Sequence, residues 1–278
     1  MARQVVPVPI LVYHSVSDDP HPYIRRFAVS PRTFARQLDT IRNADMQPLT
    51  VSDFVAKRTA DELPPRPVVI TFDDGWKDTA TTAVAELNQR SIPATLYVTT
   101  GFLRGRAGQT RMDAPSSEAL HWDDLAPLAA AGIELGAHSI THPALDAVPL
   151  AVARREVLGS REVLEDHLGT PVRSFAYPHG YHSARVRSIV AEAGFDSACV
   201  VRNALSSERD SSHTLSRILV RNDTTIEQYL SWLQGTGAPV APKRDALRTT
   251  LWRQYRRTRS VATQFGPKTS DRQTSSMA

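Results

Sequence analysis

The sequence predicts an α/β fold in which about seven parallel strands form a barrel-like sheet. Three observations predict this fold. Short apolar runs alternate along the chain with longer segments of helical periodicity, as in proteins built from alternating strands and helices. The 278 residues, 41% of them hydrophobic and 22% charged, suit one large globular domain. Helix boundaries are also marked, because Ser30 precedes Pro31 as an N-cap and Gly194 stands between a helical segment and the next strand.

Each element follows from its own stretch of sequence, in chain order. The predicted strands are 10–13, 68–72, 94–98, 133–136, 174–177, 197–201 and 218–220. The predicted helices between and after them are 31–44, 79–90, 122–131, 150–168, 184–193 and 225–233. No internal repeat is found, so the strands and helices belong to one unit.

Charge divides the chain into two parts. The formal net charge is +4, but the segment from residue 243 to the end has nine basic and two acidic residues, a local net charge of +7. The first 242 residues therefore have a net charge of −3, which excludes a uniformly basic protein that coats nucleic acid. We predict a folded domain at 1–234, followed at 235–278 by a linker and a basic tail that is partly helical and disordered at its end.

The tail contains a basic amphipathic pattern, in which Leu247, Leu251 and Tyr255 recur every four residues beside Trp252. Such a helix can dock on an anionic membrane surface, although a solvated helix or a packing extension fits the same residues. No apolar stretch approaches the roughly 18 residues of a membrane span, and the N-terminus is a poor secretory signal. We expect a cytoplasmic location with a candidate peripheral membrane contact, and the oligomeric state is left open.

The most informative motif is Thr71-Phe72-Asp73-Asp74-Gly75, which follows an apolar run at 68–70. Folds of this class place their active sites at the carboxyl ends of strands. Adjacent residues that leave a strand point in different directions, so one carboxylate can bind a metal while its neighbour accepts a proton. Taken alone, a solvated Asp-Asp-Gly turn explains these residues equally well.

A second motif, His138-Ser139-Ile140-Thr141-His142-Pro143, follows strand 133–136. Imidazoles four residues apart lie on one face of a helical turn, and Pro143 disfavours helix at His142. Asp74 would supply a third ligand and leave coordination positions open, as a catalytic site requires. The single cysteine, Cys199, excludes a zinc site built from cysteines. We expect a divalent metal, with Zn²⁺ as the default and Co²⁺, Ni²⁺, Fe²⁺ or Mn²⁺ as alternatives; two surface histidines are the alternative to any metal site.

A third motif is Arg173-Ser174-Phe175-Ala176-Tyr177-Pro178-His179-Gly180. The planar guanidinium of Arg173 can hold a catalytic carboxylate in its ionised form. The Pro-His-Gly turn can direct a backbone N–H at a developing oxyanion. Taken in isolation, an arginine before a short strand is more often part of a surface ion pair.

In this order, each after a strand, the three motifs resemble those of the polysaccharide deacetylase family, also called carbohydrate esterase family four or the nodulation-factor chitooligosaccharide deacetylase homology domain. The opening Pro9-Ile10-Leu11-Val12-Tyr13-His14-Ser15 resembles the start of a subgroup that includes biofilm poly-N-acetylglucosamine deacetylases. The resemblance covers about residues 7–234. It implies a distorted (β/α) barrel of about seven strands and hydrolysis of an N-acetyl group, or occasionally an O-acetyl group, on a sugar.

The resemblance also implies a role for each motif residue. By position, Asp73 corresponds to the general base and Arg173 to the residue that orients it. The other motif residues correspond to the metal ligands (Asp74, His138, His142) and to the substrate and oxyanion contacts (Tyr177, Pro178, His179).

Two departures from the family pattern concern the general acid. The segment Asp196-Ser197-Ala198-Cys199 lacks the family's Trp, and the segment 218–223 lacks the His of the late Leu-His pair. Expulsion of an amine nevertheless needs a proton donor. His14, at the end of the first strand, is our first candidate for that donor, with His182 and the His179 side chain as alternatives. A structural or binding role fits His14 equally well.

The sequence therefore predicts a metal-dependent hydrolase that removes acetyl from an N-acetylated sugar and releases acetate and a free amine. A carbohydrate is expected as the substrate, and nucleic acid is not expected as a partner. Two other functions stay open, because fold and metal do not define the substrate. They are a non-catalytic carbohydrate-binding domain on the same fold and an amidohydrolase that acts on a non-sugar amide.

Overall fold

The computed structural model describes residues 6–105 and 119–242. Within them, seven parallel strands close into a barrel, because each strand pairs with the next barrel strand along the chain and the last pairs with the first. This confirms the predicted (β/α) barrel. The strands are β2 (Ile10–Tyr13), β6 (Pro67–Phe72), β7 (Ala94–Val98), β8 (Ile133–Ala137), β9 (Ser174–Ala176), β10 (Ser197–Val201) and β12 (Leu215–Leu219).

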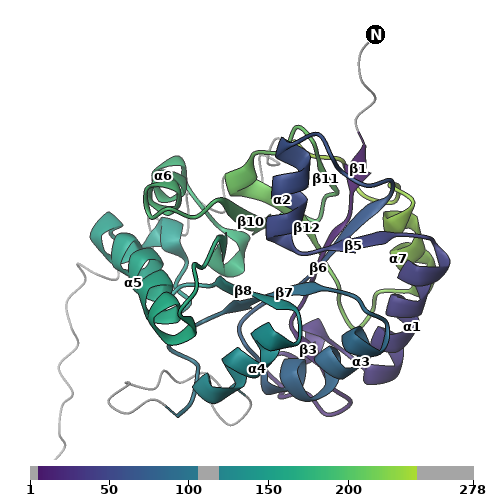
Figure 1. Cartoon of the computed structure of the whole chain (residues 1–278), viewed down its shortest axis with the longest axis horizontal. Coiled ribbons are helices and arrows are strands. Elements are labelled where there is room, and N and C mark those ends of the chain that lie inside the picture. The colour runs from purple at the N-terminus through teal and green to yellow at the C-terminus, as the bar shows by residue number, and fades with distance from the viewer. Residues whose placement is uncertain (1–5, 106–118, 243–278) are drawn as a thin grey trace, which may run out of the picture. The chain divides into compact units, whose positions relative to one another are not determined.

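Helices surround the barrel on its outer side (Figure 1). Six of them lie where helical periodicity predicts them, with ends that differ by a few residues. The helices are α1 (Pro31–Asn43), α2 (Val51–Thr59), α3 (Val84–Gln89), α4 (Leu125–Ala130), α5 (Leu150–Leu168), α6 (Ala184–Glu192) and α7 (Ile226–Leu233). Single turns of 3₁₀ helix are found at Arg25–Phe27, Trp122–Asp124, Leu145–Ala147, Pro178–Gly180 and Ser212–Thr214, and a π turn at Thr79–Ala83 precedes α3.

One strand and one helix were not predicted. The strand β5 (Gln47–Leu49) pairs with β6 outside the closed ring, and α2 follows it. A proline stands in the middle of β5, which argued against a strand because proline cannot donate to a ladder and is tolerated only at sheet edges. Two short pairs complete the strands: β1 (Pro7–Val8) with β11 (Ser206–Ser207), and β3 (Ser15–Val16) with β4 (Ala28–Val29).

Local sequence explains why the elements form where they do. All six residues of β6 are buried, as expected for a parallel strand that is covered on both faces. Helix α1 begins at a true N-cap, because the Ser30 hydroxyl accepts a hydrogen bond from the Thr33 N–H and Pro31 takes the first helical position. Helix α5 ends at Gly169, whose φ of 67° lies in the left-handed region that favours glycine.

The segment after α7 differs in part from the predicted linker. Residues 235–242 stay on the domain, since the Leu205 N–H donates to the Pro239 carbonyl and the Ala241 N–H donates to the Leu205 carbonyl. Ala241 is buried. The basic tail predicted beyond this point lies outside the described residues. In the described part of the chain, no helix combines the length and the apolar character needed to cross a membrane.

Parallel strands bring the candidate site residues to one edge of the barrel. Asp73 and Asp74 follow β6, His138 follows β8, His179 follows β9 and His14 follows β2. Because all seven strands run in the same direction, these positions lie together at the carboxyl end of the barrel.

Candidate active site

The structure brings together the three predicted metal ligands. The Asp74 Oδ1 atom lies 3.5 Å from His138 Nε2 and 3.3 Å from His142 Nε2, and the two Nε2 atoms are 3.2 Å apart. Zinc binds such atoms at about 2.0–2.1 Å in a tetrahedron, which places neighbouring ligand atoms about 3.3 Å apart. The three side chains therefore have the spacing of ligands around one small divalent ion.

Neighbouring groups orient these ligands toward a common point. The Nδ1 atom of His138 lies 2.8 Å from the Ala176 carbonyl, so Nδ1 carries the proton and Nε2 is left with its lone pair. The Trp76 indole N–H donates to Asp74 Oδ2 at 3.1 Å. The other oxygen, Oδ1, is buried and has no hydrogen-bond partner. A buried carboxylate oxygen without a donor is costly unless something binds it, and this donor set fits a divalent metal.

Burial and charge prepare two of the ligands for metal binding. Burial lowers the pKa of His142 to about 3, and His138 and His179 add to this effect while Asp74 opposes it. Burial raises the pKa of Asp74, but its hydrogen bond with His138 and the charge of His142 outweigh burial and hold that pKa well below its usual range. At neutral pH, Asp74 is thus ionised and His142 is neutral, which are the forms that bind a metal.

The loop between the two histidines is not the helical turn that their spacing predicted. Residues 138–144 are irregular, and both Ser139 (φ 65°) and His142 (φ 58°) adopt the left-handed conformation. Pro143 disfavours the helical region at His142, and the Ser139 hydroxyl accepts the His142 N–H at 3.0 Å. Asp74 has a positive φ as well, at 75°. Backbone strain of this kind gathers at functional sites, where the surrounding structure maintains it.

The predicted partnership between Arg173 and Asp73 is wrong. Arg173 precedes β9 at the amino end of the barrel, where its guanidinium donates to Asp196 at 3.0 Å on the surface. Asp73 instead pairs with Arg217 on β12, which donates to the two carboxylate oxygens from two nitrogens at 2.7 Å each. Arg217 is fully buried and lies over the Tyr97 ring. The bidentate contact anticipated for the family arginine therefore comes from a different strand.

Arg217 determines the ionisation of Asp73. Burial raises the pKa of this carboxyl, but the charges of Arg217 and His138 and the hydrogen bond from Arg217 outweigh burial and lower the pKa below its usual value. Asp73 Oδ2 lies 3.9 Å from His138 Nε2, at the edge of the metal-ligand set. An ionised carboxylate therefore lies beside the ligands in a fixed orientation.

His14 lies at the same edge of the barrel. Its ring is 5.4 Å from the Phe27 ring, and its Nδ1 atom is buried without a hydrogen-bond partner. His14 is close enough to Asp73 and Asp74 to contribute to the lowering of both their pKa values. Of the alternative acids, His179 packs against His142 with ring centroids 4.5 Å apart, and the His182 ring lies 5.1 Å from Tyr177.

Comparison with known proteins agrees with this geometry. The model of the polysaccharide deacetylase family matches residues 60–198, half of the chain. The chain belongs to the polysaccharide deacetylase family. Enzymes of this family are hydrolases that remove acetyl groups from carbohydrates. The matched segment includes Asp73, Asp74, His138 and His142, whereas Arg217 lies outside it.

Individual relatives are distant in sequence. YxkH of Bacillus subtilis, which is named for the same family, is 21% identical over 77% of this chain and 71% of its own. The deacetylase PplD of Streptococcus pyogenes, solved with acetate, has a TM-score of 0.73 at 22% identity and covers 85% of this chain and 100% of its own. IcaB of Ammonifex degensii has a TM-score of 0.66 at 23% identity, over 82% and 97% of the two chains. These structures share the fold.

The third motif of this deacetylase-family chain forms a tight turn at the barrel edge. Pro178–Gly180 is one 3₁₀ turn in which His179 (φ 58°) is left-handed and exposed. At Gly180 (φ 71°), a Cβ atom would lie 2.5 Å from the backbone nitrogen of Val201, so only glycine fits there. Tyr177 does not face substrate as predicted, because it is fully buried and donates its N–H to the Cys199 carbonyl and its hydroxyl to the His213 carbonyl.

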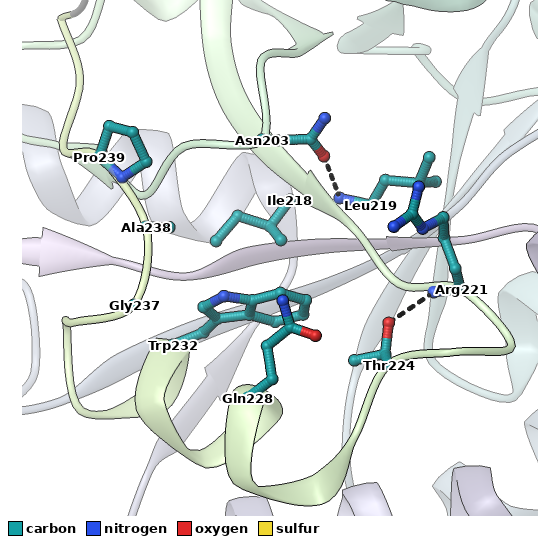
Figure 2. Close-up of a pocket in the computed structure, with 10 residues that line it drawn as sticks. All are labelled: Asn203, Ile218, Leu219, Arg221, Thr224, Gln228, Trp232, Gly237, Ala238 and Pro239. Carbon is teal, nitrogen blue, oxygen red and sulfur yellow. Dashed lines mark hydrogen bonds between the residues drawn. The ribbon is translucent and has the colours of Figure 1, made fainter.

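A separate pocket of about 280 Å³ is formed by α7 and the segments that follow β10, β12 and α7 (Figure 2). Figure 2 shows two contacts that shape it: the Leu219 N–H donates to Asn203, and the Arg221 N–H donates to the Thr224 hydroxyl. No histidine or carboxylate lines this pocket, so it lacks the groups for metal-assisted hydrolysis. Its lining residues are Asn203, Ile218, Leu219, Arg221, Thr224, Gln228, Trp232, Gly237, Ala238 and Pro239.

Proposed function

We propose that this member of the polysaccharide deacetylase family is a metal-dependent enzyme that hydrolyses the N-acetyl group of an N-acetylated sugar to acetate and a free amine. One observation carries the proposal. An ionised carboxylate, Asp73, lies 3.9 Å from one nitrogen of a three-ligand set that has the spacing of a divalent metal site. A base beside an open metal site is the arrangement that metal-assisted hydrolysis of an amide requires.

In the proposed site, Asp74, His138 and His142 would hold the ion. A divalent metal bound there supplies Lewis acidity, which polarises a carbonyl and lowers the pKa of water. Zinc suits two imidazoles and one carboxylate, and Co²⁺, Ni²⁺, Fe²⁺ and Mn²⁺ are compatible with the same donors.

The chain's own side chains supply the proton transfers of the proposed reaction. Asp73 accepts the proton of the attacking water on a carboxylate oxygen, and the bidentate contact with Arg217 fixes the direction of that oxygen. His14 returns a proton to the nitrogen of the leaving amine, which is a poor leaving group without one. The backbone N–H of His179 stays our candidate donor to the oxyanion, because the turn lies beside His142.

Acetate release from a panel of substrates tests the proposal. The panel contains N-acetylhexosamine oligomers, lipid-linked N-acetylated sugars, O-acetylated sugars and small acetylated amines. We expect release from an N-acetylated sugar, its loss on treatment with a chelator, and its recovery when Zn²⁺ or Co²⁺ is restored. Asp74→Ala and His138→Ala should abolish metal content and activity together.

Three results would contradict the proposal. Full activity of metal-free protein would exclude the metal dependence. Cleavage of small acetylated amines alone would favour an amidohydrolase that acts outside carbohydrate. Sugar binding without acetate release, in protein that contains no bound metal after growth with zinc, would favour a non-catalytic binding domain.

A further inference from the structure

The loop that carries His138 and His142 has little regular structure of its own. It lies between β8 and α5, and two of its residues, Ser139 and His142, are held in the left-handed conformation. Non-glycine residues persist there only when surrounding contacts compensate for the strain. The positions of both imidazoles therefore depend on whatever holds this loop.

One buried carboxylate makes three contacts with the loop. Glu156 lies in the second turn of α5, and 4% of it is exposed. Its Oε2 atom accepts hydrogen bonds from the N–H groups of Ile140 at 2.9 Å and Thr141 at 2.8 Å. Its Oε1 atom accepts the Thr141 hydroxyl at 2.7 Å. In the described part of the chain, Glu156 forms no ion pair with Lys or Arg, so these three donors are its principal charge-assisted partners.

The shape of α5 permits this contact. Gly159 lies one turn after Glu156 on the same helix face, and a Cβ atom at Gly159 would approach Ile140 Cδ1 to 2.8 Å. The opposite side of the loop is bound by the segment after β7, where the Gly101 N–H donates to the Ile140 carbonyl at 2.8 Å. The loop is thus clamped between α5 and this segment, and the carboxylate is the charged member of the clamp.

We propose that Glu156 is a positioning residue for the metal site: it holds residues 140 and 141 and thereby sets where His138 and His142 present their Nε2 atoms. The inference rests on the metal site of the proposed function. It assigns Glu156 no contact with the metal or the substrate. Groups that orient ligands in this indirect way commonly change metal affinity by about 10–100-fold.

Two substitutions at this position separate geometry from charge. In Glu156→Gln, the amide oxygen can accept both backbone N–H groups and the amide NH₂ can donate to the Thr141 hydroxyl, so all three contacts can be rebuilt. In Glu156→Ala, all three are lost. Glu162→Ala, an exposed position on the same helix, is the matched control.

The test is the Zn²⁺ affinity of each purified protein, measured by competition with a chromophoric chelator, together with the melting temperature of the metal-free protein. We expect Glu156→Ala to weaken Zn²⁺ binding by about 10–100-fold, and Glu156→Gln and Glu162→Ala to stay within about threefold of wild type. Co²⁺-substituted Glu156→Ala should also show an altered visible absorption spectrum. A purely structural role would lower the melting temperature and leave Zn²⁺ affinity unchanged.

Wild-type affinity in folded Glu156→Ala would overturn the inference and leave the proposed function intact. If that variant does not fold, Thr141→Val removes one of the three contacts and should weaken Zn²⁺ binding by a smaller factor; unchanged affinity there would overturn the inference as well. Absence of Zn²⁺ binding by the wild-type protein would instead overturn the proposed function, and the inference with it.

Discussion

The two ends of the barrel each contain one arginine–aspartate pair, in opposite environments. At the carboxyl end, Arg217 and Asp73 form two contacts of 2.7 Å, and their side chains are 0% and 4% exposed. At the amino end, Arg173 and Asp196 form one contact of 3.0 Å, and their side chains are 61% and 55% exposed. The same two residue types thus form a buried pair at one end of the barrel and a surface pair at the other.

The difference shows why a motif residue cannot be assigned a role from its type alone. In water, an exposed ion pair contributes about 0–1 kcal/mol, because solvent screens the charges and ordering the side chains costs entropy. A buried pair carries a large desolvation cost, so it is weak evidence for added stability, but loss of one partner leaves an uncompensated charge. The buried pair is therefore the one whose disruption reaches both folding and the site.

The largest effect is expected for Arg217→Met. This change leaves Asp73 charged and buried without its partner, so we expect the free energy of unfolding to fall by about 3–5 kcal/mol. Acetate release by the fraction that folds should fall by about 10²-fold or more, because the carboxylate is no longer oriented. Denaturant unfolding and turnover assays measure the two effects.

A double variant separates these two effects of Arg217. Adding Asp73→Asn to Arg217→Met removes the unpaired charge, so stability should recover in part while activity stays low. Wild-type stability and turnover in the single variant would contradict the importance assigned to the buried pair.

A smaller effect is expected for His14→Ala, at the same end of the barrel. If His14 donates the proton to the leaving amine, turnover should fall by about 10²-fold while metal content stays at the wild-type level. Acetate release and metal analysis of the same sample test this, with His182→Ala as the matched variant for the alternative acid. Near-normal turnover of His14→Ala would remove this residue from the mechanism.

The smallest effect is expected for Arg173→Met, at the amino end. The same substitution that disrupts the buried pair should here change the free energy of unfolding by less than about 1 kcal/mol and leave turnover within about twofold of wild type. The unfolding and acetate assays used for Arg217→Met apply without change. A loss of activity as large as that of Arg217→Met would reverse the comparison between the two ends.

Most of the fold could be predicted because its strands are written in local sequence. Six of the seven barrel strands begin within one residue of their predicted starts, since their apolar runs are bounded by turns. The exception is β12, which begins at Leu215 and not at 218. Ser216 and Arg217 interrupt its apolar run, so a strand that turns polar side chains into the barrel was mistaken for the loop before it.

That boundary error concealed Arg217. A strand from Leu215 to Leu219 would have placed one arginine between buried positions on a central strand, which is a signal for a buried charge with a partner. Arg173, by contrast, stood beside the expected motif and before a strand. Its position at the amino end follows from strand direction, and no side chain there can reach a carboxylate that follows β6.

By itself, the sequence determined the order of strands and helices, the adjacent aspartates and the paired histidines, because these features depend on neighbouring residues. Only the tertiary structure decided which arginine meets Asp73, that Tyr177 is core, and that Glu156 holds the histidine loop. Each of these contacts joins residues far apart in the chain or depends on the direction of parallel strands in a closed barrel. Burial then gives chemically identical side chains different energies, and local sequence does not encode burial residue by residue.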